Sequence, residues 1–264
     1  MQKILLSGVP QGSILGPILF NIFINDLFLF VKEAKLANFA DDNTIYAGNK
    51  NLANLLKLLE KESTMAIKWF KENNMIINPE KFQAMILGLG NQNQSEHMLN
   101  INDKNIEIKN KVTLLGIEID CKLNFDDHVT NICQKASNQI NALGRIQNFL
   151  GQKEKETMIT TFVYSNFNYA PLVWHFSSQK SQNKIEKIQE RCLRILLNDF
   201  LSSYKTLLEK SGQPTMEVKR LRILAIEIYK TLNNLNPDFM REIFHYSPHA
   251  THKKHNLQVH HRRT

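Results

Sequence analysis

The chain has 264 residues, of which 42% are hydrophobic and 22% are charged. This composition is typical of a globular protein and excludes global disorder, and the length suffices for one large domain or two ordinary ones. The three cysteines form no Cys-x-x-Cys pair, which argues against a zinc knuckle or a disulfide framework and favours a reducing compartment. The net charge of +8 is uneven, because the first 127 residues sum to −2 and the remainder to +10. A basic C-terminal half suggests a polyanionic partner, although an excess of this size can also be a solvated surface.

Residues 14–31 are apolar enough to be considered as a membrane span, but Pro17, Asn21, Asn25 and Asp26 interrupt them. A charged residue near the centre of a membrane helix is costly. Apolar residues cover most of the circumference of a helix over 18–33, which predicts a deeply buried helix instead. The opening residues also lack the pattern of a secretory signal. We therefore expect an intracellular protein of the nucleus or cytoplasm that is not secreted and does not enter a membrane.

Two short apolar runs, 36–40 and 43–47, flank the dipeptide Asp41-Asp42. β-Branched and aromatic residues in the second run favour a strand. Two such runs around a two-residue polar hinge predict a β-hairpin with both acids at its tip. An amphipathic helix is predicted next, from Leu52 to Phe70, because leucines recur on one stripe; Asn51 is its expected N-cap.

Short strands and a loop are predicted after this helix. Residues 75–77 and 84–87 are short apolar runs that favour strands. Residues 88–105 are rich in Gly, Asn and Gln, so we expect a loop that marks a boundary. Apolar residues then alternate over 106–119, which predicts a second hairpin around Asn110-Lys111.

From Phe125 onward the apolar period changes to 3.6 residues, which predicts helices alone. Helices are expected over 129–143, 154–168, 185–196 and 218–232, with Pro237 ending the last. The tail from His245 holds six histidines without the spacing of a metal site, and we expect it to be mobile. The predicted fold class is therefore α+β, a mixed region followed by a helical one.

The pair Asp41-Asp42 is the first feature that points to chemistry. Two carboxylates a few ångströms apart disfavour joint ionisation, and a divalent cation removes that conflict. Mg²⁺ is typically held by one or two carboxylates together with substrate phosphates. A lone pair of acids is more often a surface turn, so the pair alone is not specific.

The segment from Gly8 to Pro17 is the second feature. It holds three glycines and two prolines, a composition that fixes the backbone path and allows close approach to a ligand. Gln11 offers donors and an acceptor there, although the segment can equally be a structural loop that leads into a helix at Ser13. In this order and spacing, GVPQGSILGPILFNIFINDL followed by FADDNTIY resembles the reverse transcriptase domain of non-LTR retrotransposons, in the LINE-type, jockey-like group.

Later segments extend the resemblance over nearly the whole chain. Residues 69–81 look like the family's next block, a helix and turn that end in a lysine. Residues 112–117 are similar to its primer-grip hairpin, with Leu114 where an aromatic residue is usual. Residues 169–174 and 187–194 look like the helical region on the thumb side. The implied architecture is a partial polymerase palm, a hairpin-bearing antiparallel sheet with helices, followed by an all-helical thumb-like region.

These blocks predict four parts. Residues 1–90 are the partial palm with the GVPQG loop and the FADD hairpin, and residues 91–127 hold a loop and the primer-grip-like hairpin. Residues 128–240 are the helical thumb-like region, and residues 241–264 are a basic, His-rich tail.

The resemblance implies two-metal nucleotidyl transfer, in which one Mg²⁺ activates the primer 3′-hydroxyl and the other holds the phosphates of the incoming nucleotide. Asp41 matches the carboxylate that touches both ions, and Asp42 matches its peripheral neighbour. Lys81 matches a lysine proposed to protonate the departing pyrophosphate, and an ordinary turn lysine is an equally good interpretation. The implied nucleotide- and template-binding residues are Pro10, Gln11, Gly12 and Ala40, and the implied primer-grip residues are Leu115 and Gly116. Candidate contacts to the nucleic-acid backbone, each of which can also be a solvated helix face, are Arg145, Lys187, Arg191, Arg194, Lys219 and Arg222.

The implied function is that of an RNA-directed DNA polymerase with an RNA template, a DNA primer and deoxynucleoside triphosphates as partners. The family needs a third carboxylate on a strand before the GVPQG loop and a fingers region that grips the triphosphate. No acidic residue precedes Gly8, so we expect a fragment with little or no polymerase activity alone. The alternative is a non-catalytic nucleic-acid-binding remnant that uses the basic helical half.

Overall fold

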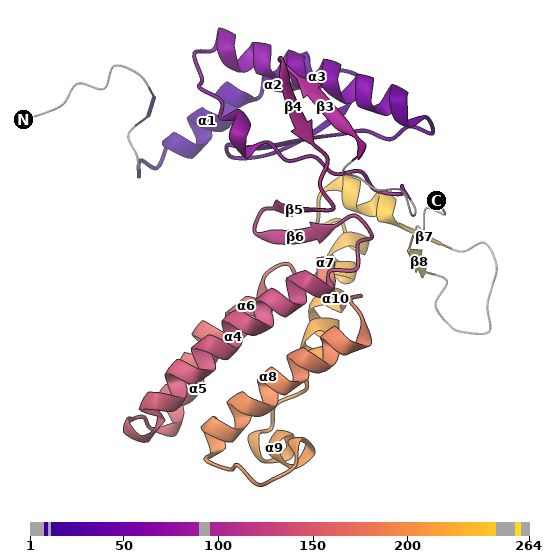
Figure 1. Ribbon diagram of the computed structural model, residues 1–264. Coiled ribbons are helices and arrows are strands. Elements are labelled where there is room, and N and C mark those ends of the chain that lie inside the picture. Colours follow the sequence, from indigo (N-terminus) through magenta and orange to yellow (C-terminus); the bar gives the residue numbers. More distant parts are fainter. Residues whose placement is uncertain (1–7, 10–11, 90–95, 247–256, 260–264) are drawn as a thin grey trace, which may run out of the picture. The chain divides into compact units, whose positions relative to one another are not determined.

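A computed structural model describes residues 8–9, 12–89, 96–246 and 257–259. The chain divides into two compact units, Met1–Ile117 and Glu118–Thr264, which are described separately below (Figure 1). Helices and small antiparallel hairpins alternate in unit 1, and helices dominate unit 2. The predicted α+β fold class is confirmed, whereas the division into four functional parts stays a prediction.

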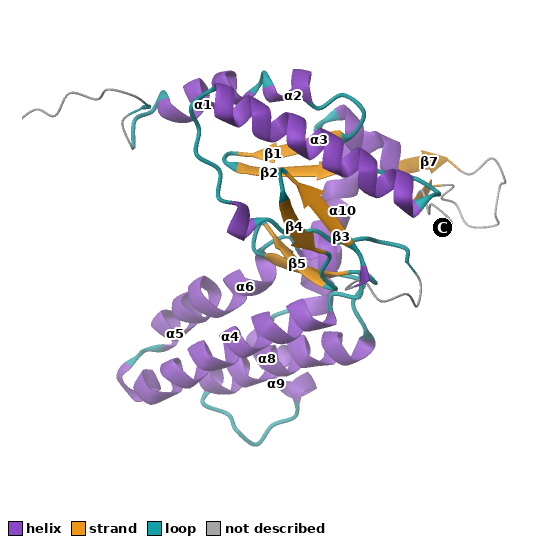
Figure 2. Cartoon of the chain, turned by 45° about the horizontal axis from the view of Figure 1, so that its top comes forward, coloured by secondary structure: helices purple, strands orange, loops and turns teal. Residues whose placement is uncertain are grey.

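Unit 1 begins with two short helices, α1 (Gly16–Ile24) and α2 (Leu27–Phe30). The hairpin strands β1 (Lys35–Phe39) and β2 (Asp42–Tyr46) follow, and then the long helix α3 (Leu52–Glu72). A 3₁₀ turn, η1 (Pro79–Lys81), leads to the strands β3 (Met98–Ile101) and β4 (Lys104–Glu107). The strands β5 (Lys111–Leu114) and β6 (Ile117–Asp120) form the hairpin at which the chain passes into unit 2. In the described residues the strands form separate two-stranded sheets (Figure 2).

Helix α3 is the scaffold of unit 1. The Asn51 side chain accepts a hydrogen bond from the Asn54 backbone N–H at 3.1 Å, so the predicted N-cap is confirmed. One side of α3 packs on α1 and α2 through a core of Ile24, Leu27, Val31, Ala66 and Trp69. The other side packs on the β3–β4 hairpin through Ile67, Ile86, Leu99, Ile101, Ile106 and Ile108. Each fully buried side chain of this size contributes roughly 1.5–3 kcal/mol to stability.

The prediction of one deeply buried helix over 18–33 is wrong. Asn25 and Asp26 separate two short helices, and only Gly16, Ile24 and Leu27 are buried on them. The described residues of unit 1 leave part of the surface of these helices uncovered. The large apolar side chains exposed there are Ile18, Leu19, Ile22, Phe23, Phe28 and Leu29. Across the described part of the chain, no helix combines the length and apolar character that a membrane crossing requires.

The strand predictions after α3 are only partly right. Residues 75–77 form no strand, and residues 84–87 contribute a single bridge, from Ala84 to Ile108. A hairpin occupies 98–107, within the predicted loop, and no turn forms at Asn110-Lys111. The real turns lie at Asn102–Asp103 and Leu115–Gly116, where every residue has a positive φ between 47° and 77°. The alternation of apolar residues marked the strands, but these left-handed turns decide which strands pair.

Unit 2 is built on two long helices, α4 (Asp126–Ile146) and α8 (Gln179–Leu197), which pack together. Between them the chain forms η3 (Gln147–Phe149), α5 (Gln152–Met158), the π-helix η4 (Ile159–Tyr164), α6 (Ser165–Asn168) and α7 (Pro171–Trp174). The helices α9 (Tyr204–Ser211) and α10 (Met216–Leu232) follow α8. Then come η5 (Asp238–Ile243) and the paired strands β7 (Phe244–Tyr246) and β8 (Leu257–Val259).

The four helices predicted for this half are confirmed, and α7 and α9 are additions. These two helices have four and eight residues, too few for a 3.6-residue period to stand out. Helix α10 ends at Leu232, and Asn234 with φ 61° follows it, so Pro237 is not its terminator. Most of the His-rich tail that we expect to be mobile lies outside the described residues.

The core of unit 2 joins α4, η4 and α8 through Val129, Ala136, Val163, Ile185 and Cys192, and it encloses Trp174. Burial raises the pKa of Cys133 to about 11 and that of Cys192 to about 12. Both are therefore protonated thiols at neutral pH and act as small apolar side chains.

Polar contacts fix the ends of the unit 2 helices. Asp126 Oδ1 accepts hydrogen bonds from the Ser178 hydroxyl at 2.6 Å and the Ser181 hydroxyl at 2.5 Å, which ties the start of α4 to the start of α8. Glu186 accepts hydrogen bonds from the backbone N–H groups of Met216 at 3.1 Å and Glu217 at 2.8 Å, at the start of α10. A carboxylate that accepts at a helix N-terminus satisfies donors that the helix leaves open.

His128 gives unit 2 a pH-dependent contact. It is buried, and its Nδ1 accepts a hydrogen bond from the Glu118 backbone N–H at 3.3 Å. Burial lowers its pKa below 6.5, so the folded chain binds fewer protons than the unfolded chain below that pH. The stability that this group contributes is therefore complete above pH 6.5 and is lost as the pH falls through its folded pKa.

We expect the variant His128→Asn, whose Oδ1 can accept the same hydrogen bond, to lose stability relative to the wild type at pH 7.5 through poorer packing. The difference should shrink on going to pH 5, because only the wild type is penalised there. Urea denaturation at both pH values measures it. A difference that is the same at both pH values would show that His128 binds its proton equally well in the folded and the unfolded chain, so that burial does not lower its pKa.

Candidate active site

The hairpin β1–β2 carries the two adjacent acids. Its register pairs Phe39 with Asp42 and Asn38 with Asn43, so the turn is Ala40–Asp41. Ala40 adopts the left-handed conformation, with φ 52°. The predicted hairpin is confirmed, with its turn one residue earlier than expected. Asp41 lies in the turn and Asp42 is the first residue of β2, and both are exposed.

Asparagines lie on both strands next to the turn. The Asn43 amide donates to the Asp41 backbone carbonyl at 2.9 Å, which holds the turn in shape. The amide of Asn38, its cross-strand partner, is buried and makes no hydrogen bond among the described residues, and Asn43 Oδ1 is in the same state. These buried amide atoms therefore lack hydrogen-bond partners among the described residues on the face of the hairpin opposite the Asp42 side chain.

Glu62 of α3 positions the segment that leads into the hairpin. Its side chain is 2% exposed. Its Oε2 accepts hydrogen bonds from three successive backbone N–H groups, at 2.6 Å from Lys32, 3.1 Å from Glu33 and 3.5 Å from Ala34. The sequence analysis missed this residue, although a signal exists. Glu62 falls on the apolar stripe of α3, between Leu59 and Ala66, where a charged residue calls for a partner.

The two acids offer oxygen ligands without competing partners. Among the described residues, neither carboxylate forms a hydrogen bond or an ion pair. Two unpaired carboxylates fit Mg²⁺, which is commonly held by one or two carboxylates while phosphates and water fill its other positions. No group of three or more His, Cys, Asp or Glu residues suited to a metal occurs in the described part of the chain. A third carboxylate, histidine or cysteine therefore does not join Asp41 and Asp42 there.

The GVPQG loop is described only in part, because Pro10 and Gln11 lie outside the described residues. Gly8 and Gly12 have φ of 81° and 83°, which only glycine adopts without strain. Among the described residues, no atom lies within 4 Å of where a Cβ on Gly12 would be. The Ser13 hydroxyl accepts a hydrogen bond from the Gly16 N–H at 3.0 Å at the start of α1.

The other site residues predicted in unit 1 are placed as follows. Lys81 ends η1 and is exposed, and no hydrogen bond or ion pair joins it to either acid in the described residues. Leu115 and Gly116 form the β5–β6 turn, and Leu115 is 37% exposed with φ 47°. These placements leave the implied roles of Lys81, Leu115 and Gly116 as predictions.

The six basic residues proposed for the nucleic-acid backbone fall into two groups. Arg145, Lys187 and Arg222 are exposed and make no hydrogen bond or ion pair with any described residue. Arg191 and Arg194 are engaged, the first with Ser137 at 3.0 Å and Asn141 at 2.9 Å, the second with Glu190 at 2.7 Å. Lys219 lies 4.4 Å from the centre of the Tyr164 ring and donates to Gln213, and burial lowers its pKa.

Comparison with known proteins supports the polymerase interpretation of unit 1. Residues 2–119 match the family model described as reverse transcriptase (RNA-dependent DNA polymerase). A probable RNA-directed DNA polymerase from transposon BS of Drosophila melanogaster is 23% identical over 206 residues, which cover 74% of this chain and 23% of that protein. The RNA-directed DNA polymerase from mobile element jockey of the same organism is 26% identical, over 73% of this chain and 22% of its own length.

A polyprotein from the type-1 retrotransposable element R1 of Bradysia coprophila is 24% identical, over 78% of this chain and 21% of its own length. This chain therefore spans less than a quarter of the length of these three relatives. No solved structure matches it. Reverse transcriptases generally use a divalent metal and bind a template and a primer. Residues 2–119 match the reverse transcriptase family model, and the chain is similar, at 23–26% identity, to RNA-directed DNA polymerases and polyproteins of mobile elements.

Proposed function

We propose that this chain is part of an RNA-directed DNA polymerase and that Asp41 and Asp42 hold Mg²⁺ in its nucleotidyl-transfer site. The observation that carries the proposal is the pair of exposed, unpaired carboxylates on a tight hairpin within a reverse transcriptase domain. When bound, the metal would supply charge neutralisation at the phosphates and activation of the primer 3′-hydroxyl. Asp41, whose turn is held by the Asn43 amide, and Asp42 would hold the metal, Asp41 as the central ligand and Asp42 as the peripheral one.

Residues from other segments would complete the proposed site. The backbone at Gly12, with Pro10 and Gln11 beside it, contacts the incoming deoxynucleoside triphosphate and the template base. Ala40 lines the primer terminus, and Leu115 and Gly116 hold the primer strand. Lys81 donates a proton to the departing pyrophosphate. The template in this proposal is RNA and the primer is DNA.

The chain alone is expected not to extend a primer. Two carboxylates without a third carboxylate, histidine or cysteine in the described residues bind Mg²⁺ weakly and do not fix the positions of two ions. A primer-extension assay with an oligo(dT) primer on a poly(rA) template, with Mg²⁺ present, should therefore show no product above that of Asp41→Asn. Extension by the wild-type chain that is lost in Asp41→Asn would overturn this part of the proposal.

Metal binding at the hairpin is tested directly with Mn²⁺, which uses the same oxygen ligands and broadens nearby NMR signals. We expect substoichiometric Mn²⁺ to broaden the backbone amide signals of residues 38–43. The variant Asp41→Asn should need at least ~10-fold more Mn²⁺ for the same effect, because half of the local charge is removed. Asp103→Asn is the matched control, since Asp103 lies in the left-handed turn of the β3–β4 hairpin. Equal broadening in Asp41→Asn and the wild type would refute the site.

A second activity is supported by the free cations of unit 2. Arg145 of α4, Lys187 of α8 and Arg222 of α10 are exposed without partners among the described residues, so we propose that they contact nucleic-acid phosphates. Each phosphate contact contributes about 0.9 to the slope of log affinity against log salt on duplex DNA. Changing all three to Gln should lower that slope by about 2 to 3. Changing the engaged residues Arg191 and Arg194 instead should disturb stability first, and an unchanged slope in the triple variant would exclude these contacts.

A further inference from the structure

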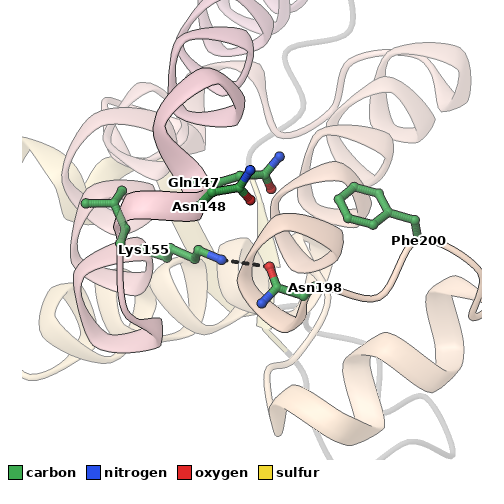
Figure 3. Close-up of a pocket in the computed structure, with 6 residues that line it drawn as sticks. Gln147, Asn148, Lys155, Asn198 and Phe200 are labelled. Atoms are coloured by element: carbon green, nitrogen blue, oxygen red, sulfur yellow. Dashed lines mark hydrogen bonds between the residues drawn. The ribbon is translucent and has the colours of Figure 1, made fainter.

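The helical unit holds a cavity of about 350 Å³ at one end of its long helices. The chain passes from α4 into α5 on one side, and α8 ends on the other. The residues that line it are Gln147, Asn148, Leu150, Lys155, Asn198 and Phe200. Figure 3 shows Lys155 of α5 reaching across to Asn198, with Gln147 and Asn148 beside them and the Phe200 ring on the far side. Its volume lies at the small end of the range of ligand pockets, and one nucleotide fits that size.

Lys155 carries a positive charge that no described carboxylate neutralises. Its side chain is 3% exposed, and its Nζ donates to Asn198 Oδ1 at 2.7 Å. An ammonium has three donors, and no ion pair with a described carboxylate uses the other two. A buried charge without a counter-ion is costly, so the group favours an anion in the cavity.

Gln147 requires a hydrogen-bond donor rather than an anion. Its Oε1 is buried and accepts no hydrogen bond from any described residue. An unsatisfied acceptor needs a donor, and a simple anion such as phosphate at neutral pH would repel it. The ligand must therefore carry both an anionic group for Lys155 and an N–H group for Gln147.

Phe200 supplies a flat apolar surface. The side chain follows the end of α8 and is 56% exposed although it lines the cavity. Aromatic faces of this kind stack with nucleobases in single-strand recognition. Among common metabolites and polymers, an anion, an N–H donor and a stacking ring occur together in a nucleotide.

We propose that this cavity binds one nucleotide unit of a nucleic-acid single strand. The phosphate lies at the Lys155 ammonium, the base donates an N–H to Gln147 Oε1, and its ring stacks on Phe200. The site goes beyond the polymerase proposal, because it uses no residue of the Asp41–Asp42 hairpin and needs no metal. A free mononucleotide presents the same groups, so the experiment includes both sources.

The test is isothermal titration calorimetry of the full chain with 5′-AMP, adenosine, inorganic phosphate and a single-stranded oligo(dA) of ten nucleotides, all in EDTA. We expect 5′-AMP to bind at least ~10-fold more tightly than adenosine or phosphate. The oligonucleotide should bind more tightly than 5′-AMP, which identifies the strand as the ligand. Tighter binding of the free mononucleotide would overturn the assignment to a strand, and no difference between 5′-AMP and phosphate would overturn the nucleotide.

The decisive variant is Asn198→Asp. It places a carboxylate beside Lys155 with almost no change of shape, and Asp tolerates the left-handed backbone of this position, φ 50°. We expect an unchanged or higher Tm together with at least ~10-fold weaker 5′-AMP binding. Phe200→Ala should also weaken binding, whereas the exposed neighbours Lys153→Met and Phe149→Ala should not. Unchanged binding in Asn198→Asp would refute the site.

Asp41→Asn should bind 5′-AMP normally, so failure of this proposal and failure of the polymerase proposal are distinguishable.

Discussion

The variant Glu186→Ala is expected to lower the free energy of unfolding of unit 2 by about 3 kcal/mol. Its carboxylate accepts hydrogen bonds from the backbone of Met216 and Glu217 and, at 2.5 Å, from the Tyr204 hydroxyl. It therefore joins α8 to both α9 and α10. Burial and this contact with Glu186 raise the pKa of Tyr204, so the phenol stays protonated and continues as a donor throughout the neutral range. Alanine at position 186 leaves two backbone donors without this acceptor, whereas the phenol keeps Gln189 Oε1 at 2.7 Å.

The measurement uses the two tryptophans, one in the core of each unit. Trp69 is 2% exposed in unit 1, and Trp174 is fully buried in unit 2. In a Trp69→Phe background, fluorescence during urea denaturation reports unit 2 alone, which avoids treating two units as one transition. Glu190→Ala is the matched control, since Glu190 also lies on α8 but pairs only with the partly exposed Arg194. A surface ion pair of that kind contributes less than about 1 kcal/mol. Equal losses in the two variants would show that Glu186 does not act as the cap of α10.

The helical half was predictable because its apolar pattern repeats over long stretches of sequence. Twenty-one residues of α4 and nineteen of α8 repeat the apolar stripe often enough to identify a helix and its buried face. Helices α7 and α9 were not predicted because they contain only about one and two turns. Tertiary contacts such as Glu186 at the start of α10 cannot be found from spacing, since thirty residues separate the partners.

The mixed half was harder to predict, for two physical reasons. Turn residues decide which strands pair, and Leu115 in a left-handed turn carries no local signal comparable with Asn-Gly. Burial of α1 and α2 was overestimated because an apolar helix does not specify how many surfaces cover it. The candidate site fared better. The hairpin and its acids were located to within one residue, whereas the contacts of Glu62 join segments about thirty residues apart and could not be found from spacing.

Glu62→Ala is the corresponding prediction for unit 1, with an expected loss of about 3 kcal/mol. One carboxylate oxygen accepts from three successive backbone donors of residues 32–34. This acceptor is 2% exposed, and loss of hydrogen bonds to a charged group costs about 1.5–3 kcal/mol. Fluorescence of Trp69 in a Trp174→Phe background follows unit 1. Glu62→Gln keeps an acceptor oxygen and should lose less than Glu62→Ala. Glu72→Ala, at the exposed end of the same helix, should be near neutral.

Glu62→Ala also tests whether the contacts of Glu62 affect metal binding at the hairpin as well as the stability of unit 1. Because residues 32–34 lead directly into β1, Glu62→Ala should also weaken the Mn²⁺-induced broadening at residues 38–43 under conditions where unit 1 is still folded. Glu62→Gln should retain most of it, since the segment keeps an anchor. If Glu62→Ala is as stable as Glu72→Ala, the three hydrogen bonds do not hold this segment in solution. If it is destabilised but binds Mn²⁺ like the wild type, the hairpin holds its acids without help from α3, and the Asn43 contact to the Asp41 carbonyl is then sufficient.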